Sequence, residues 1–182
     1  MTLEDFKRIR AAFKEKDEQS MQLGSLPMRS TKKGFWGTSN LDDVYNFFLQ
    51  KNFDKDTQFL DLGAGDGRVV LVAGLFVQAR GVECDEALVA EGRAVASKLG
   101  LEVDLVVEDM RNIDFSCYEV LYSYADQQWD FLKHKLLREL SGELYCYHDT
   151  YHPRFLEKGR ITWIGQIPIY CYTHPGVTRK DA

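Results

Sequence analysis

The sequence predicts an α/β protein with a doubly wound, mainly parallel sheet in three α/β/α layers. Three observations support this prediction. From about residue 56 the chain alternates short apolar runs with helical segments, which is the order of repeated β-α-β units. A glycine-rich loop joins the first of these strands to its helix. Two apolar runs with a short turn between them close the chain, and they predict a C-terminal antiparallel hairpin.

The composition indicates one globular domain with a mixed surface. A chain of 182 residues, 45% of them hydrophobic, is long enough to bury a core. The formal net charge is -5. Proteins that bind nucleic acid usually carry a basic face, because phosphate contacts supply much of the affinity. The acidic balance therefore makes nucleic acid an unlikely partner.

The cysteines and apolar runs indicate a cytoplasmic protein without a membrane span. The four cysteines form no C-x-x-C pair, so we expect reduced thiols rather than disulfides or a zinc site. No apolar run is long enough to cross a bilayer, and the charged N-terminus lacks a signal-peptide core.

The first 40 residues precede the alternating pattern. Residues 3–19 place Phe6, Ile9 and Phe13 at helical spacing, which predicts an amphipathic helix. Residues 23–40 are rich in glycine and polar residues and predict an irregular loop. We expect residues 1–40 to cover the site of a single domain formed by residues 41–182.

Capping and periodicity define the expected elements of that domain. Ser39 and Asn40 are typical cap residues for a helix over 41–51, whose first turn carries Asp42 and Asp43. Further helices are expected over 68–76, 86–99 and 127–140. Strands are expected over 57–62, 79–84, 103–107, 119–124, 143–148, 160–164 and 167–172.

The loop after the first strand is the most informative segment. It reads Asp61-Leu62-Gly63-Ala64-Gly65-Asp66-Gly67-Arg68 and lies where ligands bind in a doubly wound sheet. Glycines let the backbone take unusual dihedral angles and approach a ligand closely. A plain glycine-rich turn is the alternative, but a turn alone does not need three glycines between two acids.

Two ligands compete for this loop. A dinucleotide site follows G-x-G-x-x-G, and Arg68 occupies the place of the third glycine. Asp61 and Asp66 are unfavourable neighbours for a pyrophosphate and favourable ones for a cation. S-adenosylmethionine carries an α-ammonium and a sulfonium, so the charges favour it over NAD.

Acids also follow the next two strands. Glu83 has the spacing of an acid that accepts hydrogen bonds from ribose hydroxyls, Cys84 follows it, and Asp85 is better placed to cap the next helix. At the end of the third strand, Asp109 is our choice for the adenine amino group, and Met110 is expected to pack on the ring.

Together these segments resemble the cofactor-binding series of class I S-adenosylmethionine-dependent methyltransferases over residues 41–172. The resemblance implies a Rossmann-like, seven-stranded sheet with an antiparallel strand near its end. It also implies that Gly63, Ala64 and Gly65 contact the cofactor.

A narrower resemblance is to the small archaeal protein-lysine methyltransferases and their mitochondrial relatives. It comes from Gly-Asp-Gly-Arg-Val-Val at 65–70 and the helix before the fifth strand. Those enzymes carry a Pro-Tyr-Val-Pro-Thr type segment before the glycine loop. Here residues 35–39 read Phe-Trp-Gly-Thr-Ser, so Trp36 and Thr38 keep the aromatic group and the hydroxyl without either proline.

Methyl transfer is an in-line displacement that depends on positioning. The end of the fourth strand should face the methyl group, which makes Tyr124 a candidate border and Asp126 a candidate base or ammonium partner. A core aromatic and a helix cap are the respective alternatives. His148 and His152 have a metal-like spacing, but on a strand end they share no helix face, so no metal is expected.

The sequence thus predicts a methyltransferase acting on a protein side chain, with lysine the favoured acceptor. The alternatives are a small-molecule acceptor and a cofactor-binding protein without catalysis.

Overall fold

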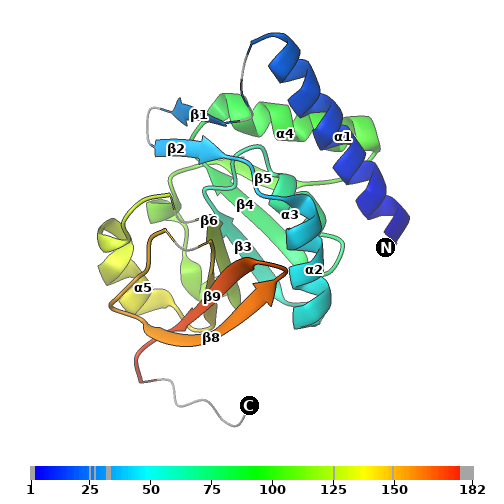
Figure 1. Cartoon of the computed structure of the whole chain (residues 1–182). Helices are drawn as coiled ribbons and strands as arrows, with labels where there is room; N and C mark the ends of the chain where they lie inside the picture. The colour runs from blue at the N-terminus through cyan, green and yellow to red at the C-terminus, as the bar shows by residue number, and fades with distance from the viewer. Residues whose placement is uncertain are drawn as a thin grey trace.

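The computed structural model describes residues 3–176 apart from 25, 27, 32, 33, 125 and 149, with 29–31 and 34–36 described by their backbone. A seven-stranded sheet in the order β5-β4-β3-β6-β7-β9-β8 forms the centre (Figure 1). The pairs among β5, β4, β3, β6 and β7 are parallel, and β9 is antiparallel to both β7 and β8. The predicted Rossmann-like fold is confirmed. The strands are β3 (Gln58–Leu62), β4 (Gln78–Glu83), β5 (Asp104–Val107), β6 (Val120–Tyr124), β7 (Glu143–Tyr147), β8 (Glu157–Ile164) and β9 (Ile167–Thr173).

Helices cover both faces of the sheet, and side chains alternate between two cores accordingly. Val120 and Tyr122 of β6 face one core, whereas Leu121 between them faces the other. The first core contains residues of α1 (Leu3–Gln22), α2 (Leu41–Lys51), α3 (Arg68–Ala73) and α4 (Glu86–Leu99). The second contains residues of α5 (Lys133–Glu139) and of the 3₁₀ turns η2 (Phe115–Cys117) and η3 (Asp130–Leu132). A further 3₁₀ turn, η1 (Met110–Asn112), follows β5.

Two helices begin where the sequence places their caps. The Asn40 side chain accepts hydrogen bonds from the backbone N–H groups of Asp42 and Asp43, and Asp85 does the same for Ala87 and Leu88. These bonds satisfy donors that have no partner within the helix. The cap of α2 is therefore Asn40, and the hydroxyl of Ser39 has no capping role.

The N-terminal helix belongs to the core of the domain. The side chains of Phe6, Ile9 and Phe13 are buried, as their spacing predicts, and α1 packs against α3 and α4 (Figure 1). No helix among the described residues is long and apolar enough to span a membrane. All four cysteines are free thiols.

Two expectations for the chain were wrong. Residues 23–40 contain a two-stranded antiparallel sheet, β1 (Met28–Thr31) with β2 (Gly34–Gly37), because backbone pairing compensates for a glycine-rich sequence without apolar alternation. The helix expected over 127–140 is reduced to η3 and α5. Its apolar positions Trp129, Leu132, Leu136 and Leu140 are buried as expected, but no side chain caps an earlier start.

Candidate functional site

The glycine turn after β3 depends on backbone conformations that other residues rarely adopt. Gly63, Gly65 and Gly67 have φ values of 75°, 56° and 70°. The amides of Gly63 and Ala64 both donate to the Val82 carbonyl at 3.0 Å. The turn is therefore held against the end of β4 by main-chain hydrogen bonds.

Two glycines outside the turn allow this close packing. A Cβ on Gly92 of α4 would lie 2.2 Å from the Asp66 carbonyl oxygen, and a Cβ on Gly81 of β4 would lie 2.7 Å from the Cβ of Ala64. Neither contact could be predicted from the sequence, because both join residues far apart in the chain. The glycine turn thus depends on α4 and β4 approaching without side chains.

The Asp66 carboxylate has a structural role in an ion-pair cluster with α1. Its oxygens accept from Nε and Nη2 of Arg68 at 2.9 and 2.8 Å and from Nζ of Lys16 at 3.1 Å. Arg68 also donates to both carboxylate oxygens of Asp17. Burial opposes ionisation of Asp66, but Arg68 and Lys16 outweigh it and hold its pKa below the ordinary value. Of the two acids expected to attract a cation, Asp66 is already engaged.

Asp61 has the opposite environment. Its side chain is 3% exposed and forms no hydrogen bond or ion pair with any residue in the described part of the chain. Burial, with Glu83 and Asp66 nearby, raises its pKa well above the ordinary value. A buried carboxyl group of this kind either stays protonated or pairs with a cation or hydrogen-bond donor from outside the chain.

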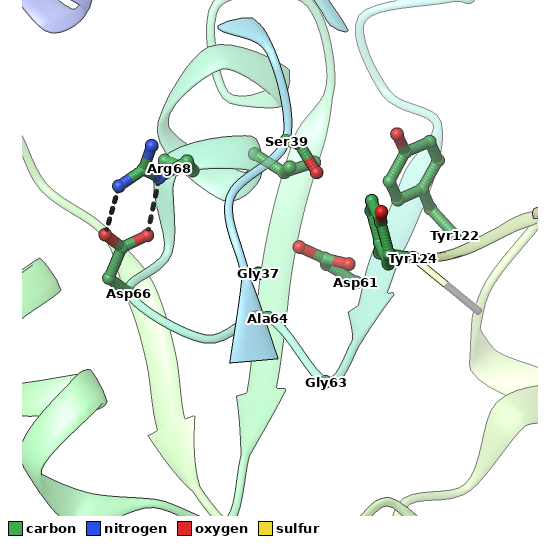
Figure 2. Close-up of a pocket in the computed structure, with 10 residues that line it drawn as sticks. Gly37, Ser39, Asp61, Gly63, Ala64, Asp66, Arg68, Tyr122 and Tyr124 are labelled. Carbon is green, nitrogen blue, oxygen red and sulfur yellow. Dashed lines mark hydrogen bonds and ion pairs between the residues drawn. The ribbon is translucent and has the colours of Figure 1, made fainter. Parts of the chain in front are cut away.

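Asp61 lines a pocket at the carboxyl end of β3. Figure 2 shows its carboxylate between the segment that leads into α2 and the tyrosines of β6, with the glycine turn beside it. The pocket is lined by Gly37, Ser39, Asp61, Gly63, Ala64, Asp66, Arg68, Val69, Tyr122 and Tyr124. Five of the predicted site residues therefore meet at one pocket: Asp61, Gly63, Ala64, Asp66 and Tyr124.

Glu83 connects the end of β4 to the glycine turn. One carboxylate oxygen accepts from the amides of Cys84 and Asp85 at 2.8 and 2.9 Å, and the other accepts from the amide of Gly65 at 3.0 Å. The second oxygen keeps a lone pair that can accept another hydrogen bond. The thiol of Cys84 is exposed beside it.

The end of β5 meets the same turn through a methionine. The Cε atom of Met110 lies 3.8 Å from the position that a Cβ on Gly63 would occupy, so this side chain packs over the turn. Asp109 caps η1 through the Arg111 amide and forms an ion pair with the Arg111 guanidinium. The three strand ends expected to hold one ligand are adjacent.

Of the residues expected at the entrance of the site and around methyl transfer, only Tyr124 lines the pocket. Tyr124 is half-buried, and its ring centroid lies 5.6 Å from that of Tyr147 and 6.3 Å from that of His148. Asp126 is half-buried after β6 and lies outside the pocket lining, and the helix begins too far along for Asp126 to cap it. Thr38 is half-buried next to the pocket residues Gly37 and Ser39, whereas the Trp36 side chain lies outside the described part of the structure.

The two histidines after β7 lie in different environments. Nδ1 of His152 is hydrogen-bonded to the Tyr172 hydroxyl at 2.5 Å, and His148 is exposed with a φ of 72°. No group of three potential metal ligands occurs among the described residues.

The other five lining residues were not predicted as site residues, and two of them, Tyr122 and Ser39, carry hydroxyl groups. Asp61 and Tyr122 are register partners in the parallel pair of β3 and β6, so their side chains project on the same face. The period of two from Tyr124 back to Tyr122 was the available signal. Ser39 was interpreted as a helix cap because serine is favoured at that position. Its place in the pocket lining was therefore not predicted.

Comparison with known protein families and with curated proteins gives no match to this sequence. Solved structures give clear matches. An RNA methyltransferase from Salinibacter ruber in complex with S-adenosylhomocysteine has 22% identity and a TM-score of 0.63, covering 79% of this chain and 97% of that chain. Magnesium protoporphyrin IX methyltransferase from Synechocystis PCC 6803 with bound S-adenosylmethionine has 13% identity and a TM-score of 0.54, covering 73% and 77%. Ribosomal protein L11 methylase from Lactobacillus delbrueckii subsp. bulgaricus has 11% identity and a TM-score of 0.54, covering 74% and 80%.

These structures, together with the strand order, define the class of fold. The chain has the fold of class I S-adenosylmethionine-dependent methyltransferases.

The first prediction concerns the packing of α4 on the glycine turn. Gly92→Ala should destabilise the protein by more than about 1 kcal/mol although alanine favours helix, because overpacking costs about 1–3 kcal/mol. Thermal unfolding measures the effect. Ala90→Ser, which adds one atom at an exposed position of the same helix, should change stability by less than about 0.5 kcal/mol. Equal melting temperatures for Gly92→Ala and wild type would contradict the packing described.

The second prediction concerns the charge of Asp61. Because its folded pKa is raised, its protonated form contributes stability fully below the ordinary pKa of about 3.9, and this contribution is lost as pH rises through the folded pKa. Asp61→Asn should therefore raise the melting temperature of the ligand-free protein at pH 7, by about 2–4 °C per kcal/mol gained, and raise it less near pH 4.

Asp66→Asn is the matched control, since its pKa is shifted in the opposite direction. It should lower the melting temperature at pH 7, because the charge that pairs with Arg68 is lost, and the loss should shrink towards acid pH. A lower melting temperature for Asp61→Asn at pH 7 would show that its carboxylate has a partner within the folded chain.

Proposed function

We propose that this protein is an enzyme that transfers a methyl group from S-adenosylmethionine to a nucleophilic acceptor. The observation that carries the proposal is the buried Asp61 carboxylate, which has no partner among the described residues and borders the glycine turn. The cofactor brings an ammonium and a sulfonium, and either positive charge is compatible with such a site. The three structural relatives described above are methyltransferases, two of them in complex with the cofactor or its product.

The strand ends provide roles for the rest of the cofactor. Gly63, Ala64 and Gly65 allow close backbone approach, and the remaining lone pair of Glu83 is available to a ribose hydroxyl beside Cys84. Met110 offers an apolar surface for the adenine ring, and Asp109 an acceptor for its amino group. Trp36 and Thr38 remain candidates for the entrance of this site.

NAD fits these residues less well. A pyrophosphate next to the glycine turn would meet the Asp61 carboxylate. The Arg68 guanidinium could offset that charge only by leaving Asp66 and Asp17, with which it forms four hydrogen bonds. The electrostatics of the turn therefore favour a cationic ligand.

For the acceptor, we propose an amine of a protein side chain, with lysine favoured. Tyr124 borders the pocket and is joined by Tyr147 and His148 in an aromatic group at the ends of β6 and β7. Aromatic faces hold an ammonium by cation–π attraction, and an apolar surrounding lowers the amine pKa so that the neutral nucleophile forms. Asp126 is the proposed base or ammonium partner in the segment after β6.

The N-terminal 40 residues are proposed to cover this site. Gly37 and Ser39 already line the pocket, and α1 contacts the glycine turn through Lys16 and Asp17. Such a cover would also suit a small-molecule acceptor, which is the alternative substrate class.

The third prediction tests the cofactor. Calorimetric titration should show binding of S-adenosylmethionine and S-adenosylhomocysteine and no binding of NAD. Gly65→Arg should abolish binding by filling the turn. Glu83→Ala should weaken it about ten- to one-hundred-fold, the range for hydrogen bonds to a charged group. Glu86→Ala, an exposed acid nearby on α4, should leave the affinity unchanged.

The outcomes distinguish three hypotheses: a methyltransferase, an NAD-binding protein and a cofactor-binding protein without catalysis. Binding of NAD alone would overturn the proposal, and unchanged affinity in both site variants would overturn the site. With binding established, a labelled-methyl screen of protein, metabolite and RNA fractions identifies the acceptor. Absence of transfer to any fraction would favour a non-catalytic binding protein.

A further inference from the structure

A second pocket lies on the α5 side of the sheet. Residues 128–130 after β6 form one wall, and residues of the 150–155 segment after β7 form the other. Its volume is about 340 Å³, which is within the range of small-ligand sites. It shares no lining residue with the pocket beside the glycine turn. The two pockets are therefore separate, and the second has no part in the proposed cofactor site.

Aromatic rings of this second pocket are held in place by other parts of the fold. The indole Nε1–H of Trp129 donates to the Tyr151 carbonyl at 3.2 Å and so joins the two walls. The His152 ring packs edge-on against Tyr170 of β9, with 4.6 Å between the ring centroids. Phe155 adds a further ring to the lining. Such a preformed aromatic surface favours a ligand with an apolar or aromatic group.

Three cations surround the second pocket without a carboxylate partner among the described residues. Arg154 belongs to the lining and is exposed. Nζ of Lys133 lies 6.0 Å from the centroid of the Phe155 ring, and Nζ of Lys158 lies 4.4 Å from that of Tyr170. The local charge therefore favours a ligand that carries an anionic group.

This positive charge is confined to the surroundings of the pocket. Further along α5, Lys135 and Arg138 both form ion pairs with Glu139, at 2.6 and 2.5 Å. A nucleic-acid strand needs a basic track along its phosphates, and these ion pairs interrupt one. The lining also contains the Asp130 carboxylate, which has no ion-pair partner among the described residues and would repel a phosphate. A compact anionic group therefore suits the pocket better than a phosphodiester chain.

The polar groups of the lining match those of a peptide. Asp130 and the side-chain carbonyl of Gln128 can accept hydrogen bonds from peptide N–H groups, and the Thr150 hydroxyl can donate to a peptide carbonyl. A carboxylate side chain would pair with Arg154, whose planar guanidinium favours bidentate contact with a carboxylate. An acidic segment with an apolar or aromatic side chain thus complements both the rings and the charges.

The second pocket continues from the place proposed for the acceptor amine. Tyr124 and Tyr147 are register partners at the ends of β6 and β7. Gln128 follows Tyr124 by four residues and Thr150 follows Tyr147 by three, so each wall begins within about 14 Å of these tyrosines. An extended peptide covers that distance with about four residues.

We propose that this pocket binds an acidic segment of the protein acceptor, within about four residues of the lysine that is methylated, with Arg154 as the partner of its carboxylate. The inference rests on the proposed function and extends it, because it specifies which lysines are methylated. Lys133 and Lys158 add to the positive potential that attracts the segment.

The fourth prediction compares a capped peptide that has carboxylates on both sides of a phenylalanine with its amide counterpart, in which asparagine and glutamine replace the acids. The indole N–H resonance of Trp129 in isotope-labelled protein reports binding, because this group forms a hydrogen bond across the pocket. The acidic peptide should shift the resonance in a saturable way. Arg154→Gln should weaken its binding about three- to ten-fold, less than for a buried ion pair because Arg154 is exposed, and should leave the amide counterpart unaffected.

Lys55→Gln is the matched control. Lys55 is an exposed cation that precedes β3, at the opposite end of the parallel strands, and it lines neither pocket. The same loss of charge should leave the affinity for both peptides unchanged. Trp36→Phe and Trp163→Phe identify the Trp129 resonance by elimination, since the chain has three tryptophans.

The inference and the proposed function fail in different ways. If the acidic peptide causes no shift at millimolar concentration, or if Arg154→Gln affects both peptides equally, the inference is overturned. An oligouridylate that binds more tightly than the acidic peptide, and is weakened by Arg154→Gln, would make the pocket a nucleic-acid site and overturn it as well. A methylated lysine without an acid within about four residues would overturn the assignment to the acceptor. If the peptide binds but neither S-adenosylmethionine nor S-adenosylhomocysteine does, the proposed function itself is overturned.

Discussion

The architecture of the site depends on the close approach of α4 and β4 to the backbone of the glycine turn. Gly92 and Gly81 leave no room for a side chain at these contacts, and the left-handed glycines of the turn allow the chain to pass between them. Main-chain bonds to Val82 and the Glu83–Gly65 bond then fix the turn. The backbone of the turn is therefore held in place by packing and hydrogen bonds within the protein, without a contribution from a ligand.

The same packing places the two acids of the turn, Asp61 and Asp66, in opposite electrostatic environments. Asp66 points towards α1, where Arg68 and Lys16 neutralise it, and this ion-pair cluster attaches the N-terminal helix to the turn. Asp61 points to the pocket, where burial disfavours its charged form and raises its pKa. Asp66 thus has its partners within the fold. Asp61 has none among the described residues, and its proposed partner is a ligand. The binding role proposed for Asp61 competes with the stability of the fold, whereas the Asp66–Arg68 ion pair stabilises it.

Much of this fold could be predicted from the sequence because the signals are local. Asn40 and Asp85 cap their helices through bonds within three residues, and the bounds of α2 and α4 agree with the prediction. The Asp66–Arg68 pair could not be assigned from spacing, since two residues on a turn can point together or apart. The contact of Gly92 with Asp66 and the β3–β6 register that aligns Tyr122 with Asp61 are tertiary. The pairing of β1 with β2 was missed because neither of these four-residue strands alternates apolar with polar residues.

The distribution of these constraints explains how the fold persists at 11–22% identity to the structures it resembles. The turn requires a few glycines and acids at fixed strand ends, while the two cores accept any apolar side chains that fill them. The end of β6 does not need a glycine or an acid at a fixed position. There Tyr124 lies beside Tyr147 and His148, and His148 holds a left-handed backbone conformation that a non-glycine residue rarely adopts. Strain of this kind persists where the surroundings impose it, and it concentrates at binding and catalytic sites. The left-handed conformation of His148 therefore supports the proposed place of the acceptor at the carboxyl ends of β6 and β7.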